Sequence, residues 1–292
     1  MHLVERTIPS KIIVLDALNR RAPSELIEKL LRRAEIGFRG EIKVDPLCNE
    51  MILPQNSILF HNYESNNHQL DTLFVCEHFI LILEIKNISG FIWYEEEKHQ
   101  FLSKKKSGEV ESFQSPIEQV KRNGDFIEGV VERLGLTVPI QKAVVIAEPS
   151  TVIGKIPYEI PIFHAIGLRT EVNKLLLKYP KPFMAKIHFE LLTDELIRMY
   201  LPGIYKPKFE IPSIRKGAIC ICGGTMRYQS GKFVCSCGNV TKEALYQGLH
   251  DYRVLFNEWI SNKEFREFFM IDSPNLVNKL LVRMKQDYKG LR

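Results

Sequence analysis

Two carboxylates and a lysine in a short apolar stretch carry the strongest chemical signal in this sequence of 292 residues. Asp71 lies in the run Leu70–Cys76, and Glu84 lies in the run Phe79–Ile85. Lys86 directly follows the second run. Both runs are rich in Leu, Ile, Val and Phe, which is typical of buried β-strands. Two carboxylates in such surroundings need a cation, either the ammonium group of Lys86 or a metal ion.

A two-residue polar connection between the two runs favours a tight antiparallel hairpin. Pairing of Cys76 with Phe79 would set its register. In that register Asp71 lies directly opposite Glu84, and Lys86, two residues along the strand, shares their face. A shift of one residue would send Asp71 to the other face, so the expected site depends on this register.

The spacing D-x12-E-x-K in a hairpin resembles the core of PD-(D/E)XK nucleases, and the surrounding sequence resembles the NERD (nuclease-related) domain over residues 34–147. The resemblance implies an α/β fold of the restriction-endonuclease-like type, with a mixed central sheet flanked by helices. It also implies metal-dependent hydrolysis of phosphodiester bonds in DNA. The motifs that carry it are G-F-R-G-E at 37–41, Q-L-D at 69–71, E-I-K-N-I-S-G at 84–90 and S-P-I-E-Q at 115–119.

The resemblance also implies a role for each site residue. Asp71 and Glu84 would hold one or two Mg2+ or Mn2+ ions, which prefer oxygen ligands. Glu41 would complete the metal site or act through water. Lys86 would orient the attacking water, and Gln119 would help to position it. Without the resemblance, Glu41 is better explained as a solvated carboxylate on a helix, and Gln119 can be explained as a surface amide near a helix N-terminus.

The elements that must position these residues follow from local patterns. A helix is expected from Pro23 through Ala34, and the glycines Gly37 and Gly40 are expected to interrupt it, so that Glu41 lies near its end or in a second short turn. A second helix is expected to begin after the N-cap Ser115, with a capping box, and to stop at 135. The remaining strands are expected at 58–61, at 91–94, continuing the central sheet, and at 140–147, as its last strand.

A second chemical signal lies near the end of the sequence. Four thiols in two knuckles fit a tetrahedral, structural zinc site on a β-hairpin, and the cluster resembles a zinc ribbon. Each knuckle has one spacer residue where two are usual, so two redox-active thiol pairs and a ribbon that no longer holds metal remain open alternatives. The four cysteines are Cys220, Cys222, Cys235 and Cys237.

Composition sets broad limits on partners and location. The net charge of +5 permits a nucleic-acid partner but does not argue for one, because a basic binding surface must be clustered. The apolar runs are too short to span a bilayer, and the first residues show no signal-peptide pattern. We therefore expect a cytoplasmic protein that does not bind membranes.

The sequence predicts five consecutive parts. They are an N-terminal segment and helix (1–33), a nuclease-like core (34–150), an extension with a Pro-rich linker (151–212), a zinc-ribbon-like module (213–240) and a helical C-terminal module (241–292). Three helices are expected in the last part, either as a bundle packed on the cysteine module or as a helix-turn-helix that approaches phosphates.

Two classes of function fit these observations. The first is a nuclease that cleaves DNA with Mg2+ or Mn2+ and carries structural Zn2+. The second is a catalytically silent nucleic-acid-binding or regulatory protein that uses the zinc ribbon and the helical tail. The intact set of Asp71, Glu84 and Lys86 favours the enzyme, because a silent scaffold has no reason to keep two opposed carboxylates.

Overall fold

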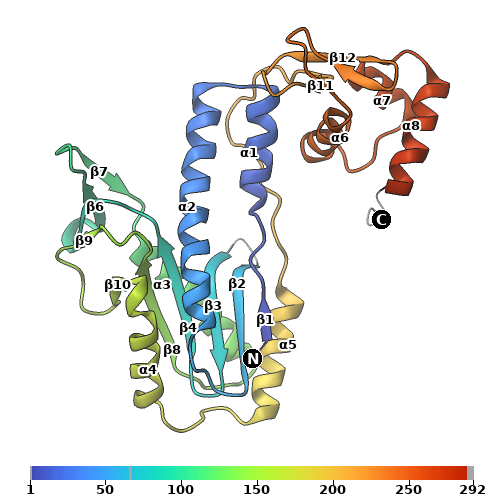
Figure 1. Cartoon of the computed structure of the whole chain (residues 1–292). Coiled ribbons are helices and arrows are strands. Elements are labelled where there is room, and N and C mark those ends of the chain that lie inside the picture. The colour runs from blue at the N-terminus through green and yellow to red at the C-terminus, as the bar shows by residue number, and fades with distance from the viewer. Residues whose placement is uncertain (1, 66–67, 288–292) are drawn as a thin grey trace. The chain divides into compact units, whose positions relative to one another are not determined.

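The computed structural model describes residues 2–65 and 68–287, and the chain divides into two compact units (Figure 1). Unit 1 comprises Met1–Ile8 and Glu35–Ile204, and unit 2 comprises Pro9–Ala34 and Tyr205–Arg292. The chain therefore leaves unit 1 after eight residues and returns to it within the long helix α2 (Glu25–Asn49). The finer division into five parts stays a prediction.

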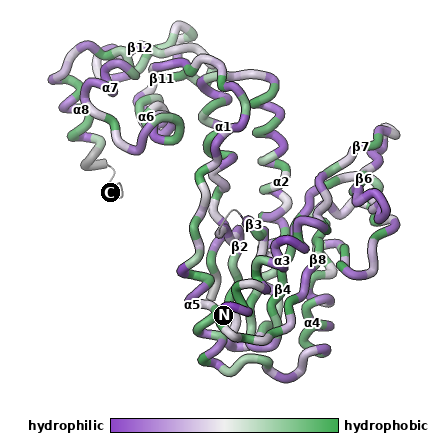
Figure 2. The backbone as a smooth tube through the Cα atoms, turned by 180° about the vertical axis from the view of Figure 1, so that it is seen from behind, coloured by the Kyte–Doolittle hydropathy of each residue, from purple (hydrophilic) through white to green (hydrophobic). Residues whose placement is uncertain are grey.

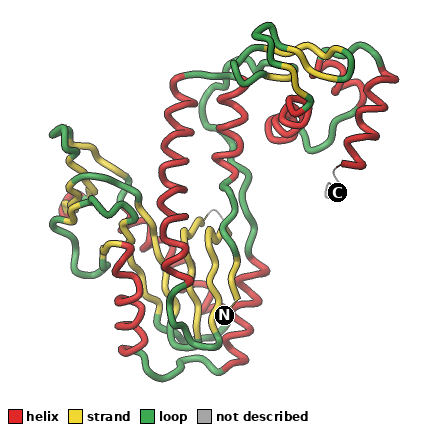
Figure 3. Tube along the Cα trace, in the orientation of Figure 1, coloured by secondary structure: helices red, strands yellow, loops and turns green. Residues whose placement is uncertain are grey.

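Unit 1 is built on a mixed sheet, in which six strands are found among the described residues (Figure 3). The strands β2, β3 and β4 are antiparallel, whereas the β1–β2, β4–β8 and β8–β10 pairs are parallel. This sheet confirms the expected mixed α/β class. The run at 140–147 is not its last strand, because β10 pairs with β8 and forms the edge. In spatial order the strands are β1 (His2–Val4), β2 (Ser57–Ser65), β3 (His68–Cys76), β4 (Ile80–Lys86), β8 (Ile140–Ile146) and β10 (Ile162–His164).

Both faces of this sheet are covered. Side chains alternate between faces along each strand, so Ile80 and Ile82 pack in the layer with α3 (Pro116–Arg133) and α5 (Lys186–Met199). Leu81 and Leu83 pack in the opposite layer with α2 and α4 (Leu168–Lys178), which follows the short 3-10 helix η2 (Ala165–Gly167). Hydrophobic residues correspondingly predominate in the central strand β4 (Figure 2).

A second sheet corrects the expectation that residues 91–94 continue the first. After β4, Gly90 adopts a left-handed conformation with φ 101°, and a Cβ there would lie 2.4 Å from the carbonyl oxygen of Lys104. This turn directs the chain out of the central sheet. Within the described residues, the second sheet contains β5 (Phe91–Glu95), β6 (Gln100–Lys104), β7 (Val110–Phe113) and β9 (Val152–Ile153), with the 3-10 helix η1 (Glu96–Lys98) between β5 and β6.

The expected interruption of the first long helix is also wrong. Helix α2 continues through Gly37 and Gly40, and both glycines keep a helical backbone. Gly40 is buried against the end of β4, where an added Cβ would lie 2.5 Å from Cβ of Asn87. Asn87 also donates a 2.8 Å hydrogen bond to the carbonyl of Ile36. Gly40 therefore serves close packing between the helix and the sheet rather than helix termination.

The predicted start of α3 is confirmed. The Ser115 hydroxyl accepts a hydrogen bond from the Glu118 N–H, Pro116 occupies the first turn, and Gly135 with φ 66° follows the helix end. The reciprocal bond of a capping box is not among the hydrogen bonds of the described residues, and the Glu118 carboxylate instead accepts from the Tyr94 hydroxyl.

Unit 2 combines the cysteine module with helices. Helices α6, α7 and α8 share one apolar core with Met226 and Phe233 of the cysteine module. This packing fits the bundle that was expected for the C-terminal helices, and a capping box from Ser261 to Glu264 opens α7. The elements are β11 (Ala218–Ile219), β12 (Thr225–Gln229), β13 (Lys232–Val234), β14 (Val240–Thr241), α6 (Glu243–Leu255), α7 (Asn262–Phe269) and α8 (Pro274–Asp287). Residues 288–292 of the expected helical tail lie outside the described residues.

A buried ion pair joins the first helix of the chain, α1 (Ser10–Arg21), to α6. Arg21 and Asp251 are both fully buried, and the Arg21 Nε donates to Asp251 at 2.8 Å. Arg21 also donates to the carbonyls of Arg215 and Gly217, and its guanidinium lies 4.6 Å from the ring centre of Phe268. Helix α1 was not expected from the sequence, and these contacts make it part of unit 2.

Candidate nuclease centre and cysteine module

The register of the central hairpin is the one expected from the sequence. Thr72 pairs with Leu83, and the residues that follow along β3 pair in the same register. The same register sets Asp71 across from Glu84. One carboxylate oxygen of Asp71 also accepts a 2.7 Å hydrogen bond from the N–H of Ile85, which fixes this side chain against β4.

Glu84 lies deep in the protein, with 1% of its surface exposed. Its Oε1 accepts a 2.5 Å hydrogen bond from Lys86, whose ammonium also donates to Oε1 of Gln119 at 3.2 Å. Helix α3 therefore brings Gln119 to the Asp71–Glu84–Lys86 group. The other Glu84 oxygen, Oε2, is buried and has no hydrogen-bond partner among the described residues.

Burial and like charge determine the protonation of this group. Burial raises the pKa of Glu84 well above its usual value, and the neighbouring charge of Asp71 raises it further. Burial lowers the pKa of Lys86, but the charges of Glu84 and Asp71 raise it by more, so that the ammonium form is favoured. A lysine cation thus offsets part of the negative charge that the two carboxylates introduce.

Glu41 reaches the site from helix α2, which covers the opposite face of the sheet. Its Oε2 accepts a 2.5 Å hydrogen bond from Nη1 of Arg6. Burial and the charge of Asp71 raise the pKa of Glu41 to about 7, although the charge of Arg6 acts in the other direction. Glu41 is therefore electrostatically linked to Asp71 but is held by an arginine outside the expected set.

Sequence reasoning missed three residues around Glu41. Arg6 forms a bidentate ion pair with Asp45, at 2.9 and 3.0 Å, and Asp45 lies 3.2 Å from Nδ1 of the buried His61. Asp45 follows Glu41 by four residues, so a continuous α2 would have placed both on one helix face. Arg6 and His61 carry no comparable signal in the sequence. Arg6 lies 35 residues from Glu41, and His61 lies within a strand whose other residues suggest no special role.

These carboxylates meet two chemical requirements for a divalent cation. They supply hard oxygen donors, and the buried Oε2 of Glu84 lacks the partner that a buried carboxylate oxygen normally has. Glu41, Asp71 and Glu84 do not gather their oxygens within 4.8 Å of one another, a spacing that only the cysteine cluster meets in the described part of the chain. Asp71 and Glu84 lie across from each other on the hairpin, whereas Glu41 comes from helix α2.

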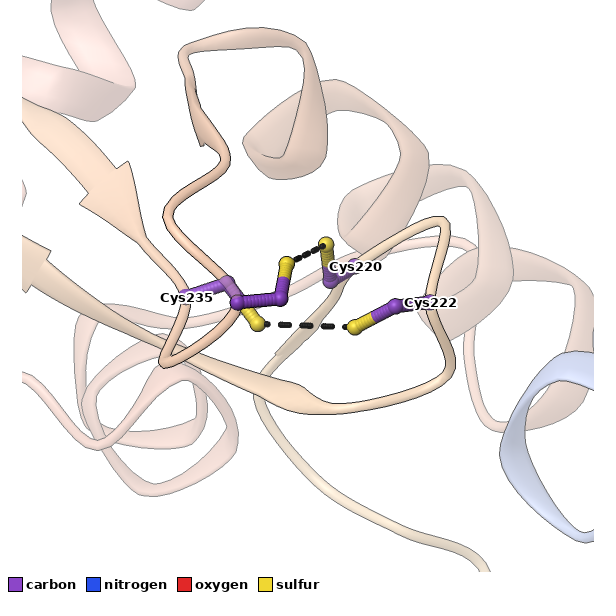
Figure 4. A group of neighbouring side chains, drawn as sticks. Cys220, Cys222 and Cys235 are labelled. Atoms are coloured by element: carbon purple, nitrogen blue, oxygen red, sulfur yellow. Dashed lines mark hydrogen bonds between the residues drawn. The ribbon is translucent and has the colours of Figure 1, made fainter.

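The four cysteines of unit 2 converge as expected (Figure 4). The sulfur of Cys220 lies 3.7 Å from that of Cys237, and the sulfur of Cys222 lies 3.6 Å from that of Cys235. Each knuckle ends in a tight turn at a glycine with a left-handed backbone conformation, Gly223 in the first and Gly238 in the second.

This cysteine module fits a soft, tetrahedrally bound cation. All four sulfurs lie within 4.8 Å of one another, as ligands of one ion must. Hydrogen bonds from the N–H of Cys222 and from the side chain of Asn239 lower the pKa of Cys220 to about 6, which favours the thiolate that binds metal. The single-residue spacers therefore do not prevent the four sulfurs from converging.

The fold and the carboxylate centre of unit 1 define a mixed α/β domain with an acidic, lysine-bearing site on its sheet. Residues 36–147 match the family model of the nuclease-related domain, NERD. The match includes Glu41, Asp71, Glu84, Lys86 and Gln119 but not Arg6. No curated protein and no solved structure gives a significant match to the chain. None of the described helices is both long and apolar enough to cross a membrane.

Proposed function

We propose that this protein is a metal-dependent nuclease that hydrolyses phosphodiester bonds of DNA. The family match supports a nuclease-related function, and one observation carries the proposal further. The buried carboxylates of Asp71 and Glu84 face each other beside Lys86 and Gln119, and one oxygen of Glu84 has no partner among the described residues. Burial of that oxygen costs free energy unless a bound cation or a proton compensates it.

Asp71 and Glu84 would hold one or two Mg2+ or Mn2+ ions, with Glu41 completing the site or acting through water. A bound cation of this kind supplies charge stabilisation at the scissile phosphate and lowers the pKa of a bound water. The hydrogen bond from Ile85 keeps one Asp71 oxygen fixed on the hairpin, so the carboxylate is oriented before any ligand arrives.

Lys86 and Gln119 are the groups of the site that can act on water and phosphate. The ammonium of Lys86 lies between Glu84 and Gln119, and a quarter of its side chain is exposed. It can therefore orient a water molecule or offset charge that develops on the phosphate. The amide of Gln119 receives a hydrogen bond from Lys86 through its oxygen, which leaves its NH2 group to position the water.

The direct test is cleavage of labelled DNA and RNA, single-stranded and double-stranded, with Mg2+, with Mn2+ and with chelator. We expect metal-dependent cleavage of DNA by the wild type. The double variant Asp71→Asn/Glu84→Gln should lose both cleavage and Mn2+ binding in calorimetry. Arg122→Gln, which removes an exposed charge one turn beyond Gln119, is the matched control and should retain Mn2+ binding.

Two results would overturn the proposal. Equal Mn2+ binding by the wild type and by the double variant would exclude the metal site. A wild type that binds DNA but shows no turnover with either metal would favour a silent nucleic-acid-binding or regulatory protein, in which the cysteine module and the C-terminal helices provide the binding surface.

A further inference from the structure

We propose that Arg6 is a positioning residue of the nuclease centre and that the N-terminal strand β1 completes a site which the family-matched segment does not contain by itself. The inference rests on the proposed function of unit 1. It concerns a residue 30 positions before the matched segment begins at residue 36.

The contacts of Arg6 connect the parts of the site that come from different elements. Its Nη1 donates to Oε2 of Glu41 on α2, and its Nη2 donates to the main-chain carbonyl of Asp71 on β3 at 2.9 Å. The Asp71 carboxylate in turn accepts from the N–H of Ile85. Arg6 therefore holds one carboxylate directly and fixes the backbone that carries another, on the side of β3 that faces α2.

The hydrogen-bonding pattern leaves Glu41 able to act further. Arg6 occupies Oε2 of Glu41, whereas no hydrogen bond to its Oε1 is found among the described residues. This is the arrangement of a ligand side chain that a neighbouring donor orients. The guanidinium is nearly enclosed, with 3% of its side chain exposed, and Asp45 fixes its plane with two further bonds. Arg6 is therefore not free to bind substrate phosphate itself.

Strand β1 explains how such a distant residue is held in place. His2, Leu3 and Val4 pair in parallel with Ile58, Leu59 and Phe60 of β2, and Arg6 follows the end of this ladder by two residues. The first eight residues belong to unit 1 even though the next 26 belong to unit 2. The first residues of the chain thus add strand β1 to the sheet of unit 1, although the rest of that unit follows only from residue 35 onward.

The test measures Mn2+ affinity by calorimetry in four full-length variants. Arg6→Met should weaken Mn2+ binding by about 10- to 100-fold, the usual effect of removing a residue that orients a metal ligand. Arg6→Lys keeps the charge but not the planar fork, so it should recover part of this loss. Arg198→Met, which breaks an exposed ion pair with Glu195 in the same unit, should bind Mn2+ like the wild type.

The variant Arg6→Met/Asp45→Asn separates positioning from charge balance. It removes one positive and one negative charge together, so the net charge of the site is unchanged and no Asp45 carboxylate is left without its cation. Its melting temperature should approach that of the wild type, whereas its Mn2+ affinity should remain low. This variant also keeps the test valid if Arg6→Met does not fold.

Wild-type Mn2+ affinity in either Arg6→Met or Arg6→Met/Asp45→Asn would overturn the inference, because Arg6 would then only neutralise buried charge. The outcome is distinct from a failure of the proposed function. A wild type that binds Mn2+ through Asp71 and Glu84 but cleaves no nucleic acid would overturn the nuclease, and the same four variants would still decide the role of Arg6. Absence of Mn2+ binding by the wild type would overturn both.

Discussion

Charge burial is the main feature of unit 1 at the scale of single residues. The charges of Glu41 and Glu84 both interact with that of Asp71, and Lys86 and Arg6 approach these carboxylates from opposite faces of the sheet. Because burial disfavours charged carboxylates, protons occupy part of this site near neutral pH. A divalent cation that binds here competes with those protons, so metal affinity and pH are coupled.

The first prediction follows from Glu41. Its pKa of about 7 means that Mn2+ binding must displace a proton at lower pH. Mn2+ affinity should therefore rise as the pH increases through about 7, approaching a tenfold gain per pH unit on the acidic side for each displaced proton. Calorimetry across this range should show a shallower dependence for Glu41→Gln. An affinity that does not change with pH would contradict the assigned protonation.

The same raised pKa has an opposite effect on the metal-free protein. Because folded Glu41 holds its proton more tightly than unfolded Glu41, the proton stabilises the folded state. This contribution is fully present below the unfolded pKa, near 4.5, and is lost as the pH rises through about 7. Metal-free wild type should therefore lose unfolding free energy over this interval relative to Glu41→Gln, as denaturant titrations in chelator would show.

A second prediction concerns Lys86. Lys86→Ala should leave DNA binding nearly unchanged and should retain Mn2+ binding, because the carboxylates remain. Cleavage should fall by about a hundredfold or more, the scale expected for one positioned electrostatic or proton-transfer group. Single-turnover cleavage at saturating Mn2+ is the measurement. Unchanged turnover with reduced stability would show that Lys86 only pairs with Glu84.

Residue patterns predict the hairpin part of the site well, because its geometry is local. A two-residue connection fixes the register, and the register alone sets Asp71 across from Glu84. The roles of Arg6 and His61 cannot be predicted in this way, because their contacts with α2 and β3 depend on how strands and helices far apart in the sequence are packed.

At the scale of elements, the two glycines of α2 differ in their surroundings and therefore in their structural roles. The same residue type that ends many helices can also permit close packing, and only the neighbouring element distinguishes the two cases. Gly40 lies against Asn87 of the E-I-K-N motif, whereas at Gly37 no described residue outside the helix's own neighbouring backbone lies within 4 Å of an added Cβ. The sequence could not predict a continuous helix, because the partner of Gly40 is 47 residues away.

These two glycines give a matched pair of variants. Gly40→Ala should destabilise unit 1 by about 1–3 kcal/mol, because the added methyl group must displace Asn87. Gly37→Ala should stabilise the helix by up to about 1 kcal/mol, because alanine is the better helix former and the position is open. Chemical denaturation of both variants measures the difference. Equal effects would mean that helix propensity alone governs both positions.

The position of β5 shows a second limit at this scale. Its aromatic and β-branched residues correctly predict a strand, but strand propensity does not identify the sheet that the strand joins. That choice depends on the turn at Gly90 and on pairing with β6 and β9.

For the whole molecule, we expect the cysteine module and the carboxylate site of unit 1 to respond independently to mutation. Purified protein should contain about one zinc ion per chain, from the single four-thiolate set. Cys222→Ser should lose zinc and lower the stability of unit 2 while metal-dependent cleavage is retained. Ser236→Ala, at the exposed spacer of the other knuckle, is the control that should keep zinc.

Elemental analysis and thermal unfolding of Cys222→Ser and Ser236→Ala would decide this point. A folded wild type without metal, in which all four thiols titrate freely, would contradict the zinc assignment. Loss of cleavage together with zinc would instead show that the two units are coupled.

The interleaving of the two units is the feature of the whole molecule that sequence patterns predict least. A division into consecutive segments assigns residues 1–33 to one N-terminal part, whereas the structure divides them between both units. The contacts that decide this, such as Arg21 with Asp251, span 230 positions and leave no periodic signal nearby.

This interleaving also fixes the order in which a ribosome can complete the two units. Unit 1 has all its residues once position 204 has emerged, and domains generally fold as units during synthesis. Helix α1 is made among the first residues, and of the residues that pack with its apolar side chains Val14 and Leu18 only Ile27 is made early, whereas Tyr205, Val254 and Leu255 follow after unit 1. For most of translation α1 thus lacks most of the apolar partners that cover it in the folded protein. A nascent chain stalled before residue 205 would carry a folded unit 1 beside a helix whose apolar side chains are still exposed, the kind of surface that chaperones bind.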